Sequence, residues 1–472
     1  MEITKMHDIP KGWTRTTLGK VCSKPKYGWT SKASKTGVLK YLRTSDISGG
    51  KINWETVPYC QEIPPESEKY KIYKNDILVS RAGSVGISCL IKDAPIDTVF
   101  ASYLIRFKTL DGIEPKYVEY YLKSDTYWRS ISDFTAGIAI PNVNASKLSN
   151  LEIPLPSQYE QRRIVAKLEK LLAKVETCRE RLNKIPAILK RFRQSVLAAA
   201  CSGRLTADWR EQNSKVKPAE RLGDGDPPSD FDLPSAWNWL LSAHAFGFVT
   251  SGSRGWARYY SDKGAIFLRV GNLNHDSIKL DLRSIQRVSP PVNAEGRRTK
   301  VIEGDILISI TADVGMVALV EAGLEEAYIN QHVALGRPVG NMDRRYLAYF
   351  LAAKNGGQSQ FLNLQRGATK VGLGLDDIRR IWIARPPLPE QQEIVRRVEA
   401  LFKIADQIEE RYKKAKAHID KLTQSILAKA FRGELVPQNQ NDDPTSELLK
   451  LIKDDTLKGQ HGHSGRGKRR NK

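Results

Sequence analysis

The sequence predicts an α+β protein in which two mixed α/β domains are separated by a coiled coil of two long helices. Three observations lead to this fold class. They are an internal repeat that spans most of the chain, a heptad pattern of apolar residues near the end of each repeat, and short β-rich segments in front of each heptad pattern. Together they indicate two copies of one unit, each a globular domain followed by a long helix.

Composition limits the size and the partners of the protein. The chain has 472 residues, too many for a single hydrophobic core, and 40% of them are hydrophobic, enough for two or three folded domains. Its 75 Lys and Arg residues outnumber its 53 Asp and Glu residues and give a formal net charge of +22. This excess favours nucleic acid as a partner, because neutralised phosphates release counterions. A surplus for solubility or an anionic membrane surface is the alternative.

The cysteines and the apolar runs bear on metal binding and compartment. The five cysteines are scattered without a CxxC pair, and no His stands at zinc-ligand spacing, so we expect no metal site and a reducing compartment. Residues 1–12 lack an apolar signal core, and no run approaches the roughly 18 apolar residues of a membrane span. We therefore expect a cytoplasmic protein without a membrane partner.

The internal repeat is clearest around the start and the end of each heptad segment. A Pro-rich turn, a Glu-Gln pair and a closing Ser-x-Leu-Ala…Gly segment each occur twice, 230 residues apart (151 to 381) and without gaps. Two such matches in register indicate duplication rather than chance. The matching segments are residues 151–156 and 381–386, 160–165 and 390–395, and 195–205 and 425–435.

A weaker match extends into the two front halves. Asn75–Ser80 with Gly86 resembles Gly304–Ser309 with Gly315, and Tyr41-Leu-Arg43 resembles Phe267-Leu-Arg269. Between these points the halves differ, which indicates one scaffold that carries two different surfaces. We expect strands within residues 76–79, 103–107 and 305–310, and short amphipathic helices at residues 117–122 and 346–351.

Each long helix is predicted from apolar residues whose spacing alternates between four and three. A period of 3.5 sustained over this length is typical of a coiled-coil seam. Two long helices that pack separately on their own domains are the alternative. The expected seam consists of Ile164, Leu168, Leu171, Val175, Leu182 and Leu189 in the first helix, and Ile394, Val398, Leu401, Ile408, Ile419 and Leu422 in the second.

Turn residues give the domain boundaries. A Pro-rich turn precedes each long helix, and Gly203 and Gly433 are expected to end them. The linker between the halves is long enough for either direction of pairing. We expect a first domain (residues 1–157), a first helix (158–203), a linker (204–232), a second domain (233–388), a second helix (389–433) and a basic, disordered tail (434–472).

At these repeated segments the sequence resembles the specificity subunit of type I restriction–modification enzymes, over essentially the whole chain to about Leu435. The resemblance rests on both copies of the Pro-rich turn with Glu-Gln…Ile-Val, on both closing segments, and on Asp-Ile-Leu-x-Ser in each front half. The second copy departs from the pattern at Ala384-Arg385, where the first has Pro154-Leu155. With this resemblance we expect the helices to pair antiparallel and the domains to have a pseudo-two-fold arrangement.

The resemblance implies a non-catalytic DNA sequence-recognition subunit with two target recognition domains. Each domain would read one half of an asymmetric bipartite DNA site, with the helices as spacer. Two methyltransferase (modification) subunits would dock on this chain and methylate adenine with S-adenosylmethionine. Restriction subunits would then join them and supply translocation and cleavage that need ATP and Mg. This chain itself would hold no cofactor.

The residues agree that catalytic chemistry is not evident in this chain. We find no Gly-rich phosphate loop that ends in Lys-Ser or Lys-Thr. Asp226-Pro-Pro-Ser229 is similar to the signature of amino-methyltransferases, but Ser stands where an aromatic residue must stack on the flipped base. A stand-alone coiled-coil DNA-binding regulator is the main alternative, and an enzyme with an unrecognised active site is another.

Candidate DNA-binding residues lie in the polar loops of both domains. Base reading needs donors and acceptors at base edges, with Lys and Arg on phosphates. Arg43 and Arg269 occupy equivalent places, which favours a shared backbone contact over sequence choice. For every candidate a solvated side chain is the alternative. The candidates are Ser31, Lys32, Ser34, Lys35, Arg43, Ser45 and Arg81 in the first domain, and Ser253, Arg254, Arg258, Arg269, Asn272, Asn274, Arg366 and Lys370 in the second.

The two copies of the repeat are alike in some parts and differ in others. The long helices and their flanking turns are alike, which suits identical contacts with two copies of one partner. The unlike loops suit two different half-sites.

Overall fold

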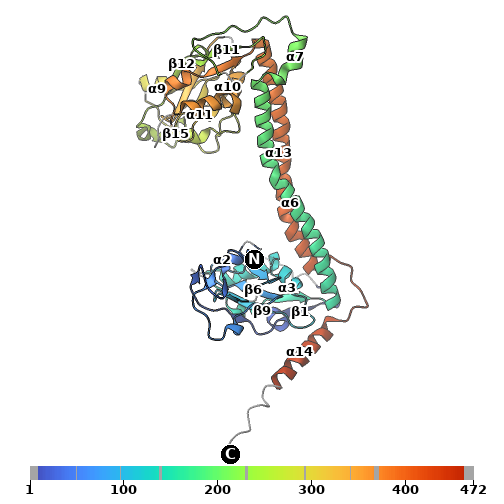
Figure 1. Cartoon of the computed structure of the whole chain (residues 1–472). Coiled ribbons are helices and arrows are strands. Elements are labelled where there is room, and N and C mark those ends of the chain that lie inside the picture. The colour runs from blue at the N-terminus through green and yellow to red at the C-terminus, as the bar shows by residue number, and fades with distance from the viewer. Residues whose placement is uncertain are drawn as a thin grey trace, which may run out of the picture. The chain divides into compact units, whose positions relative to one another are not determined.

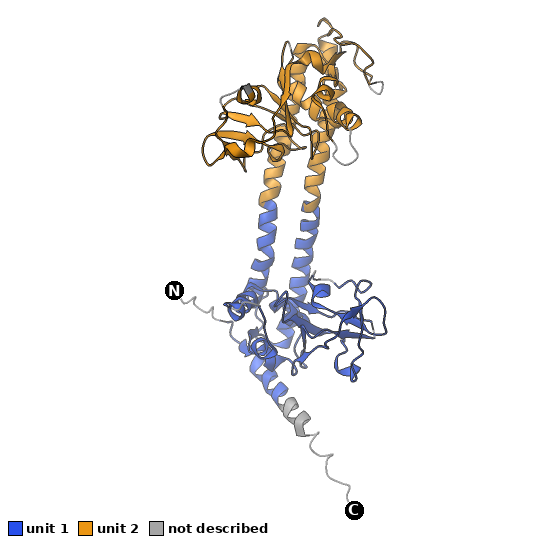
Figure 2. Ribbon diagram, turned by 90° about the vertical axis from the view of Figure 1, so that its left-hand side faces the viewer, with its two compact units in different colours: residues 1–182, 415–472 blue, residues 183–414 orange. Residues whose placement is uncertain are grey.

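The computed structural model describes residues 9–48, 50, 52–95, 97–137, 141–228, 232–291, 294–340, 342–365 and 372–461, with backbone alone for 294 and 454–461. The chain forms two compact units (Figure 2). Unit 1 comprises residues 1–182 and 415–472, and unit 2 comprises residues 183–414. Each unit holds one globular domain and one half of each of two long helices. Because both long helices are divided between the units, unit 1 is built from two separate segments of the chain, whereas unit 2 is one continuous segment.

The first domain contains three sheets. A two-stranded antiparallel sheet joins β1 (Thr14–Thr17) to β10 (Glu152–Leu155). A four-stranded antiparallel sheet has the order β2-β9-β6-β7, with β2 (Lys26–Tyr27), β6 (Asp76–Ser80), β7 (Ser88–Leu90) and β9 (Leu104–Lys108). The third sheet has the order β3-β5-β4-β8, in which β4 and β8 are parallel, with β3 (Ala33–Ser34), β4 (Lys40–Leu42), β5 (Tyr59–Cys60) and β8 (Thr98–Phe100).

The second domain repeats this topology strand for strand. β11 (Asn238–Leu241) pairs with β20 (Trp382–Arg385). The second sheet is β12-β19-β16-β17, with β12 (Phe246–Ser251), β16 (Ile306–Ser309), β17 (Val317–Leu319) and β19 (Val333–Pro338). The third is β13-β15-β14-β18, with β13 (Tyr260–Ser261), β14 (Ala265–Leu268), β15 (Gln286–Val288) and β18 (Ala327–Ile329). The duplication predicted from sequence is therefore confirmed in the fold.

Short helices cover the sheets, and the two predicted ones correspond to α3 and α10. Their aromatic residues Tyr117 and Tyr346 are fully buried, and each hydroxyl donates to a carbonyl of the two-stranded sheet, that of Pro154 or Ala384, at 2.6 Å. The first domain has α1 (Leu18–Val21), α2 (Thr44–Ile47), η1 (Ser67–Lys69), α3 (Pro115–Tyr121), α4 (Asp125–Thr135) and α5 (Ala145–Ser149). The second has α8 (Ser242–Ala245), η3 (Trp256–Tyr259), η4 (Val270–Asn272), α9 (Ala294–Thr299), α10 (Arg344–Ala352), η5 (Lys354–Gln358), α11 (Ser359–Leu364) and α12 (Leu375–Arg379).

The long helices are α6 (Gln158–Cys201) and α13 (Leu388–Phe431), each of 44 residues and therefore about 66 Å long (Figure 1). In unit 1 the start of α6 packs with the end of α13, where Arg179 lies 3.7 Å from Asp420. In unit 2 the end of α6 packs with the start of α13, where Arg193 binds Asp406 at 2.7 Å. The helices are thus antiparallel, as expected.

Each long helix ends two residues before a glycine, with Cys201 before Gly203 and Phe431 before Gly433. Gly203 and Gly433 have φ of +73° and +76°, the left-handed conformation that ends a helix at little cost only for glycine. A Cβ at these positions would stand 2.5 Å from Pro234 and 2.2 Å from Pro10, respectively. The same tight turn therefore places the chain after each long helix against the start of a domain.

Burial along the predicted seam is graded. Ile164, Leu168, Ile394 and Val398 are fully buried, because the domain core covers the helices there. Ile408, in contrast, is 41% exposed, and Cys178 at the equivalent place in α6 is also exposed. Neither belongs to the hydrophobic core of its unit, so the helices are open to solvent at these two seam positions. Val175 and Leu189 are buried, and Leu171, Leu182, Leu401, Ile419 and Leu422 are half-buried.

The segments after the long helices are more ordered than expected. In the linker (204–232), η2 (Arg204–Thr206) and α7 (Ala207–Gln212) form directly after α6. In the tail, which we expected to be disordered from residue 434, α14 (Thr445–His461) forms. Thr445 is buried and its hydroxyl donates to the Gly12 carbonyl at 2.7 Å. Leu448, Leu449 and Ile452 pack on the core of unit 1, and this apolar contact is the reason for the difference. Residues 462–472 lie outside the described residues.

Candidate nucleic-acid interface

The repeated Glu-Gln pair fixes each domain to its long helix. Gln161 accepts a hydrogen bond from the Glu114 backbone N–H at 2.9 Å and donates to the Pro156 carbonyl at 3.1 Å. Gln391 makes the same two bonds, with Asp343 at 2.8 Å and Pro386 at 2.8 Å. Both amides are fully buried, so leaving either without partners would cost free energy. This explains why Gln occurs at both positions.

In unit 1 the neighbouring Glu160 is buried beneath Trp13. The Trp13 indole N–H donates to its carboxylate at 3.0 Å, and the Gln438 side-chain amide donates to the other oxygen at 2.7 Å. Burial raises the pKa of Glu160, although these hydrogen bonds oppose the shift. Nearby, Arg163 binds Asp442 through two hydrogen bonds of 3.1 and 2.5 Å, which lower the pKa of Asp442. The segment after α13 is thereby tied to the start of α6.

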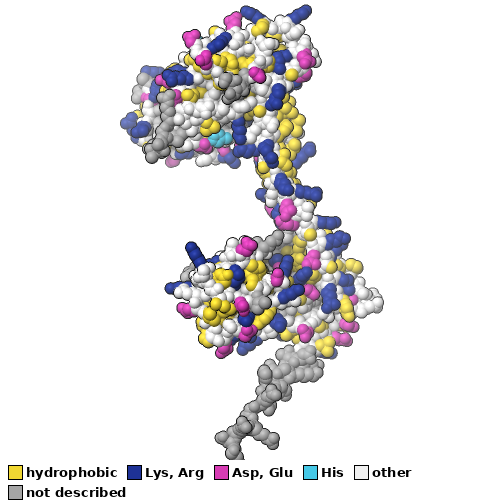
Figure 3. All heavy atoms as spheres, in the orientation of Figure 1, with side chains coloured by type: hydrophobic (Ala, Val, Ile, Leu, Met, Phe, Trp, Pro, Cys, Tyr) yellow, Lys and Arg dark blue, Asp and Glu magenta, His cyan; other side chains and the backbone are white. Residues whose placement is uncertain are grey.

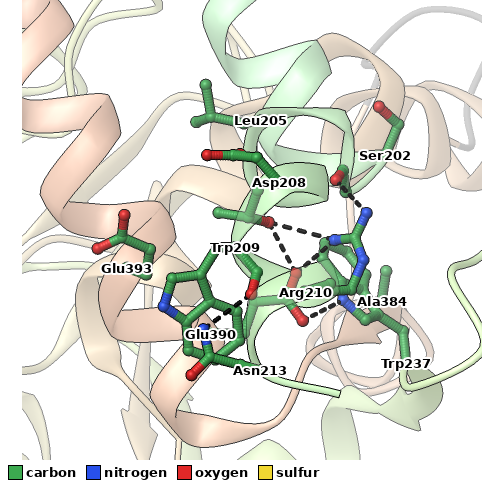
Figure 4. A network of polar contacts seen from close by, with 12 residues as sticks. Ser202, Leu205, Asp208, Trp209, Arg210, Asn213, Trp237, Ala384, Glu390 and Glu393 are labelled. Carbon is green, nitrogen blue, oxygen red and sulfur yellow. Dashed lines mark hydrogen bonds and ion pairs between the residues drawn. The ribbon is translucent and has the colours of Figure 1, made fainter.

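Unit 2 holds the equivalent Glu390 with a cation instead (Figure 4). The Trp237 indole N–H donates to Glu390 at 2.9 Å, and the Thr206 hydroxyl donates to its other oxygen at 2.7 Å. Arg210 of α7 forms an ion pair with this carboxylate and donates to the Gly203 carbonyl at 2.6 Å. Arg397 binds Asp208 at 2.6 Å. The segment after α6 is therefore fixed to the start of α13 by charge as well as by shape.

The Asp-Ile-Leu-x-Ser motif positions a loop at the end of β6 and of β16. Asp76 accepts from the Tyr73 backbone N–H and Asp305 from the Ile302 backbone N–H, both at 2.8 Å. At the other end of each strand, Ser80 and Ser309 accept from the Gly86 and Gly315 backbone N–H groups, both at 2.9 Å. These glycines have φ of +86° and +93°. The motif is structural, and it places residues 81–86 and 310–315 in the same way in both domains.

We call the residues at this strand end, with their neighbours on the adjacent strands, the variable edge. In the first domain it comprises Tyr27, Arg81, Tyr103 and Asn142. The Arg81 guanidinium lies 4.9 Å from the centre of the Tyr27 ring and donates to the Asn142 amide oxygen at 3.4 Å. The Tyr103 side chain is 61% exposed. A stacked Arg, an exposed phenol and an amide together offer donors, acceptors and an aromatic face.

In the second domain the variable edge comprises Ser251, Ile310, Thr311, His332 and Gly372. Backbone bonds establish the equivalence, since Arg81 bonds to Tyr103 at 2.9 Å and Ile310 bonds to His332 at 3.0 Å. Likewise Ala82 bridges to Asn142 and Thr311 bridges to Gly372. His332 is half-buried and hydrogen-bonded to the Thr311 hydroxyl at 2.5 Å. The same backbone therefore presents different chemistry in the two domains.

The predicted polar loops lie beside these edges. Both follow a glycine, Gly28 or Gly252, at which a Cβ would stand 2.2 or 2.4 Å from the backbone of the neighbouring strand. In the first domain Lys32 and Lys35 are exposed. The two serines are engaged within the loop, because the Ser31 hydroxyl accepts a hydrogen bond from the Glu62 backbone N–H and the Ser34 hydroxyl accepts one from the Thr36 backbone N–H.

In the second domain Arg254 is exposed, and the exposed Arg258 lies 4.9 Å from the Tyr259 ring centre. Ser253 has an internal role, because its hydroxyl donates to Glu295 at 2.9 Å and accepts from Arg298 at 3.0 Å. Glu295 is partly buried, yet hydrogen bonds from Arg298, Trp256 and Ser253 lower its pKa. This network fixes the start of the loop and leaves Arg254 at its tip.

Arg43 and Arg269 are structurally equivalent, as the repeat predicted. Each follows a strand, β4 or β14, and its backbone N–H donates to the side chain three residues later, Asp46 at 2.8 Å or Asn272 at 2.9 Å. The Arg43 guanidinium also binds Asp46 through two hydrogen bonds, which raise its pKa. The Arg269 guanidinium forms no ion pair within the described part of the chain. Only the second of these arginines is thus available to a phosphate without giving up a partner.

Three further candidates lie near these turns. Asn272 is 2% exposed, and its amide donates to the Asp281 and Ser284 carbonyls, so it stabilises the loop from inside. Asn274 is half-buried and accepts from the Asp276 backbone N–H at 3.1 Å. Ser45 is exposed. Arg366 and Lys370 lie outside the described residues. The candidates drawn from the sequence do not include Tyr27, Tyr103, Asn142, Thr311 or His332 of the variable edges.

The architecture and the paired variable edges define a class: a two-domain recognition subunit built on one duplicated scaffold. A family model described as the type I restriction modification DNA specificity domain matches residues 10–187 and 282–417, more than half of the chain. The chain therefore belongs to the type I restriction–modification specificity subunit family. Its function is DNA sequence recognition by two recognition domains.

Individual relatives agree with this assignment. The chain is 28% identical to the EcoBI specificity subunit of Escherichia coli, covering 94% of this chain and 90% of the relative. It is 30% identical to the StySPI specificity subunit of Salmonella potsdam, covering 92% of each.

Solved structures support the fold. One neighbour is a chain from a structural study of the complex assembly and conformational transition of a type I R-M system. It has a TM-score of 0.68 at 22% identity, and the match covers 91% of this chain and 100% of the neighbour. The HsdS subunit from Thermoanaerobacter tengcongensis has a TM-score of 0.57 at 22% identity, covering 91% and 99%. Separately, none of the helices in the described ranges is long and apolar enough to cross a membrane.

Proposed function

We propose that each domain reads one half of an asymmetric bipartite DNA site through its variable edge and the adjacent loop. The observation that carries this proposal is the different chemistry at equivalent backbone positions, with Arg81 and Tyr103 in the first domain and Ile310 and His332 in the second. Base edges are distinguished by the pattern of donors and acceptors that they meet. Two identical domains would read a symmetric site, whereas these two would not.

Among the predicted residues, we propose that the exposed cations contact the DNA backbone. Lys32, Lys35, Arg254 and Arg258 have this role as exposed cations, and the half-buried Arg269 joins them, because cations near a reading surface fix register without specifying sequence. Arg366 and Lys370 stay candidates on sequence alone. The buried Asn272 and the bonded Ser253 support the loops from which these cations project.

We further propose that α6 and α13 set the distance between the half-sites. A heptad of seven residues adds about 10.5 Å of helix, which corresponds to roughly three base pairs. The test is to insert one heptad into α6 after Leu182 and one into α13 after Lys414, so that the antiparallel seam stays in register. We expect both half-sites to be kept and the gap to grow by about three base pairs, as read from duplexes selected out of a random library. An unchanged gap would contradict the spacer role.

The partners follow from family membership and remain part of the proposal. Two methyltransferase subunits would dock on this chain and supply S-adenosylmethionine chemistry, and restriction subunits would bring ATP and Mg. The assembled complex would then be an adenine methyltransferase and an ATP-dependent endonuclease in the cytoplasm. The repeated Glu and Gln residues are buried and internally bonded, so docking would use the outer surface of the long helices rather than these motifs. Co-purification with a methyltransferase subunit, followed by mapping of methylated adenines, tests this.

A further inference from the structure

One side of α6 in unit 1 carries a row of cations. Lys167, Lys174 and Arg181 are seven residues apart, and Lys170 lies between the first two on the same side of the helix. All four are exposed. Within the part of the chain that the structure describes, none of them forms an ion pair or a side-chain hydrogen bond. We call these four residues the α6 basic row; its main members repeat at intervals of about 10.5 Å.

The row is free of opposing charge. The exposed acidic residues of α6, Glu169, Glu176 and Glu180, occupy other heptad positions. Glu169 pairs with Lys116 and Glu176 with Arg179, both away from the row. The sequence pattern continues in unit 2 with Lys184 and Arg191, which are 14 and 21 residues after Lys170. Basic side chains are frequent along the exposed stretches of the long helices (Figure 3).

The duplicated helix does not share this feature. The residues of α13 that correspond to the row are Arg397, Ala400, Ile404 and Arg411. Of these, Arg397 is already paired with Asp208 and Glu393. The scaffold therefore does not require the row, since an equivalent helix folds without it. Exposed, unpaired, like-signed charges also repel one another, so their presence calls for a partner of opposite charge.

We infer that the α6 basic row contacts phosphates of the duplex that joins the two half-sites. The inference rests on the proposed bipartite reading, because only then does a stretch of DNA pass along the spacer. Regularly spaced cations match an extended polyanion, and DNA interfaces are strongly positive. A protein partner fits less well, because protein interfaces are depleted in lysine. The contact is to the backbone, so it adds affinity without adding sequence information.

The test neutralises the row in the full chain with Lys167→Gln, Lys170→Gln, Lys174→Gln and Arg181→Gln. Glutamine keeps helix propensity and length, so the helix should be retained, and circular dichroism checks this. Binding to a random-sequence duplex is measured over a range of salt concentrations. We expect the slope of log Kobs against log salt to become shallower by about 0.9 for each phosphate that the row no longer neutralises, up to about 3.6 for four. The ratio of specific to nonspecific affinity should not change.

A matched control removes four exposed cations from α13, namely Lys403, Arg411, Lys416 and Lys421. We expect this control to leave the slope nearly unchanged. An equally shallow slope in both variants would overturn the inference in favour of a general field effect. An unchanged slope in the α6 variant, together with failure to co-purify methyltransferase subunits, would overturn it in favour of a protein partner. Failure of the bipartite reading itself would appear in the selected sequences rather than in the slope, so the two failures are distinguishable.

Discussion

The two sites that fix the domains to the long helices share a tryptophan–glutamate hydrogen bond but differ in the second partner of the glutamate. In each, a buried tryptophan N–H binds a buried glutamate, Trp13 with Glu160 in unit 1 and Trp237 with Glu390 in unit 2. The second partner is the neutral amide of Gln438 in unit 1 but the guanidinium of Arg210 in unit 2. Duplication therefore kept the side of the contact that lies in the repeated motif. The partner that lies in the segment after each long helix was free to change, and it is a neutral amide in unit 1 and a cation in unit 2.

The difference in charge between the two partners predicts the largest loss of stability in unit 2. Arg210→Met would leave the fully buried Glu390 carboxylate without its cation, and breaking a buried pair in this way costs about 3–5 kcal/mol. We expect the unfolding transition of unit 2 in urea to move to lower concentration while that of unit 1 stays. An Arg210→Met variant as stable as the parent would contradict the ion-pair account.

The matched change in unit 1 should be milder. Gln438→Met removes one hydrogen bond to Glu160, worth about 1.5–3 kcal/mol because the acceptor is charged, and it leaves the Trp13 bond in place. Limited proteolysis of the segment after α13 should become faster. Equal destabilisation by Gln438→Met and Arg210→Met would show that the charge difference has no consequence.

A third prediction concerns the variable edges. Arg81→Ala removes the guanidinium that is stacked on Tyr27, and each specific base contact is worth about 1–3 kcal/mol of discrimination. We expect relaxed sequence choice at one or two base pairs of a single half-site. Lys35→Ala, a change to an exposed cation nearby, serves as control and should weaken binding evenly across sequences.

The smallest expected effect is on the pH dependence of the stability of unit 1. Because burial raises the pKa of folded Glu160 above that of the unfolded chain, the folded state binds this proton more tightly. Stability should therefore fall as pH rises from the ordinary glutamate pKa through the raised value, and a tenfold difference in proton affinity between the two states corresponds to about 1.4 kcal/mol. Glu160→Gln should flatten this part of the profile in urea unfolding measured from pH 4 to pH 8. A profile that keeps the same slope would contradict the assignment to Glu160.

The sequence predicted the features that repeat, because periodicity and turn residues act locally. The seam, the glycine ends at Gly203 and Gly433, and both Asp-Ile-Leu-x-Ser strands follow from spacing alone. The helix α14 was missed because the polar segment before it resembles a disordered tail. The spacing of Leu448, Leu449 and Ile452 was nevertheless a signal of an apolar helix face.

The site was less predictable, because side-chain partners come from distant parts of the chain. Nothing near Asn272 in the sequence reveals that the Asp281 and Ser284 carbonyls will occupy its amide. Similarly, Tyr27 and Arg81 meet only because β2 and β6 both flank β9. Polarity and position therefore indicated polar loops but could not separate exposed side chains from those that support a loop from inside.

We propose that one scaffold carries two independent reading surfaces. The most direct measurement selects bound duplexes from a random library with the chain in complex with its methyltransferase subunits, for the parent, Arg81→Ala and His332→Ala. We expect a bipartite sequence in which Arg81→Ala relaxes one half only and His332→Ala relaxes the other half only. Changes in both halves from either single substitution would contradict it.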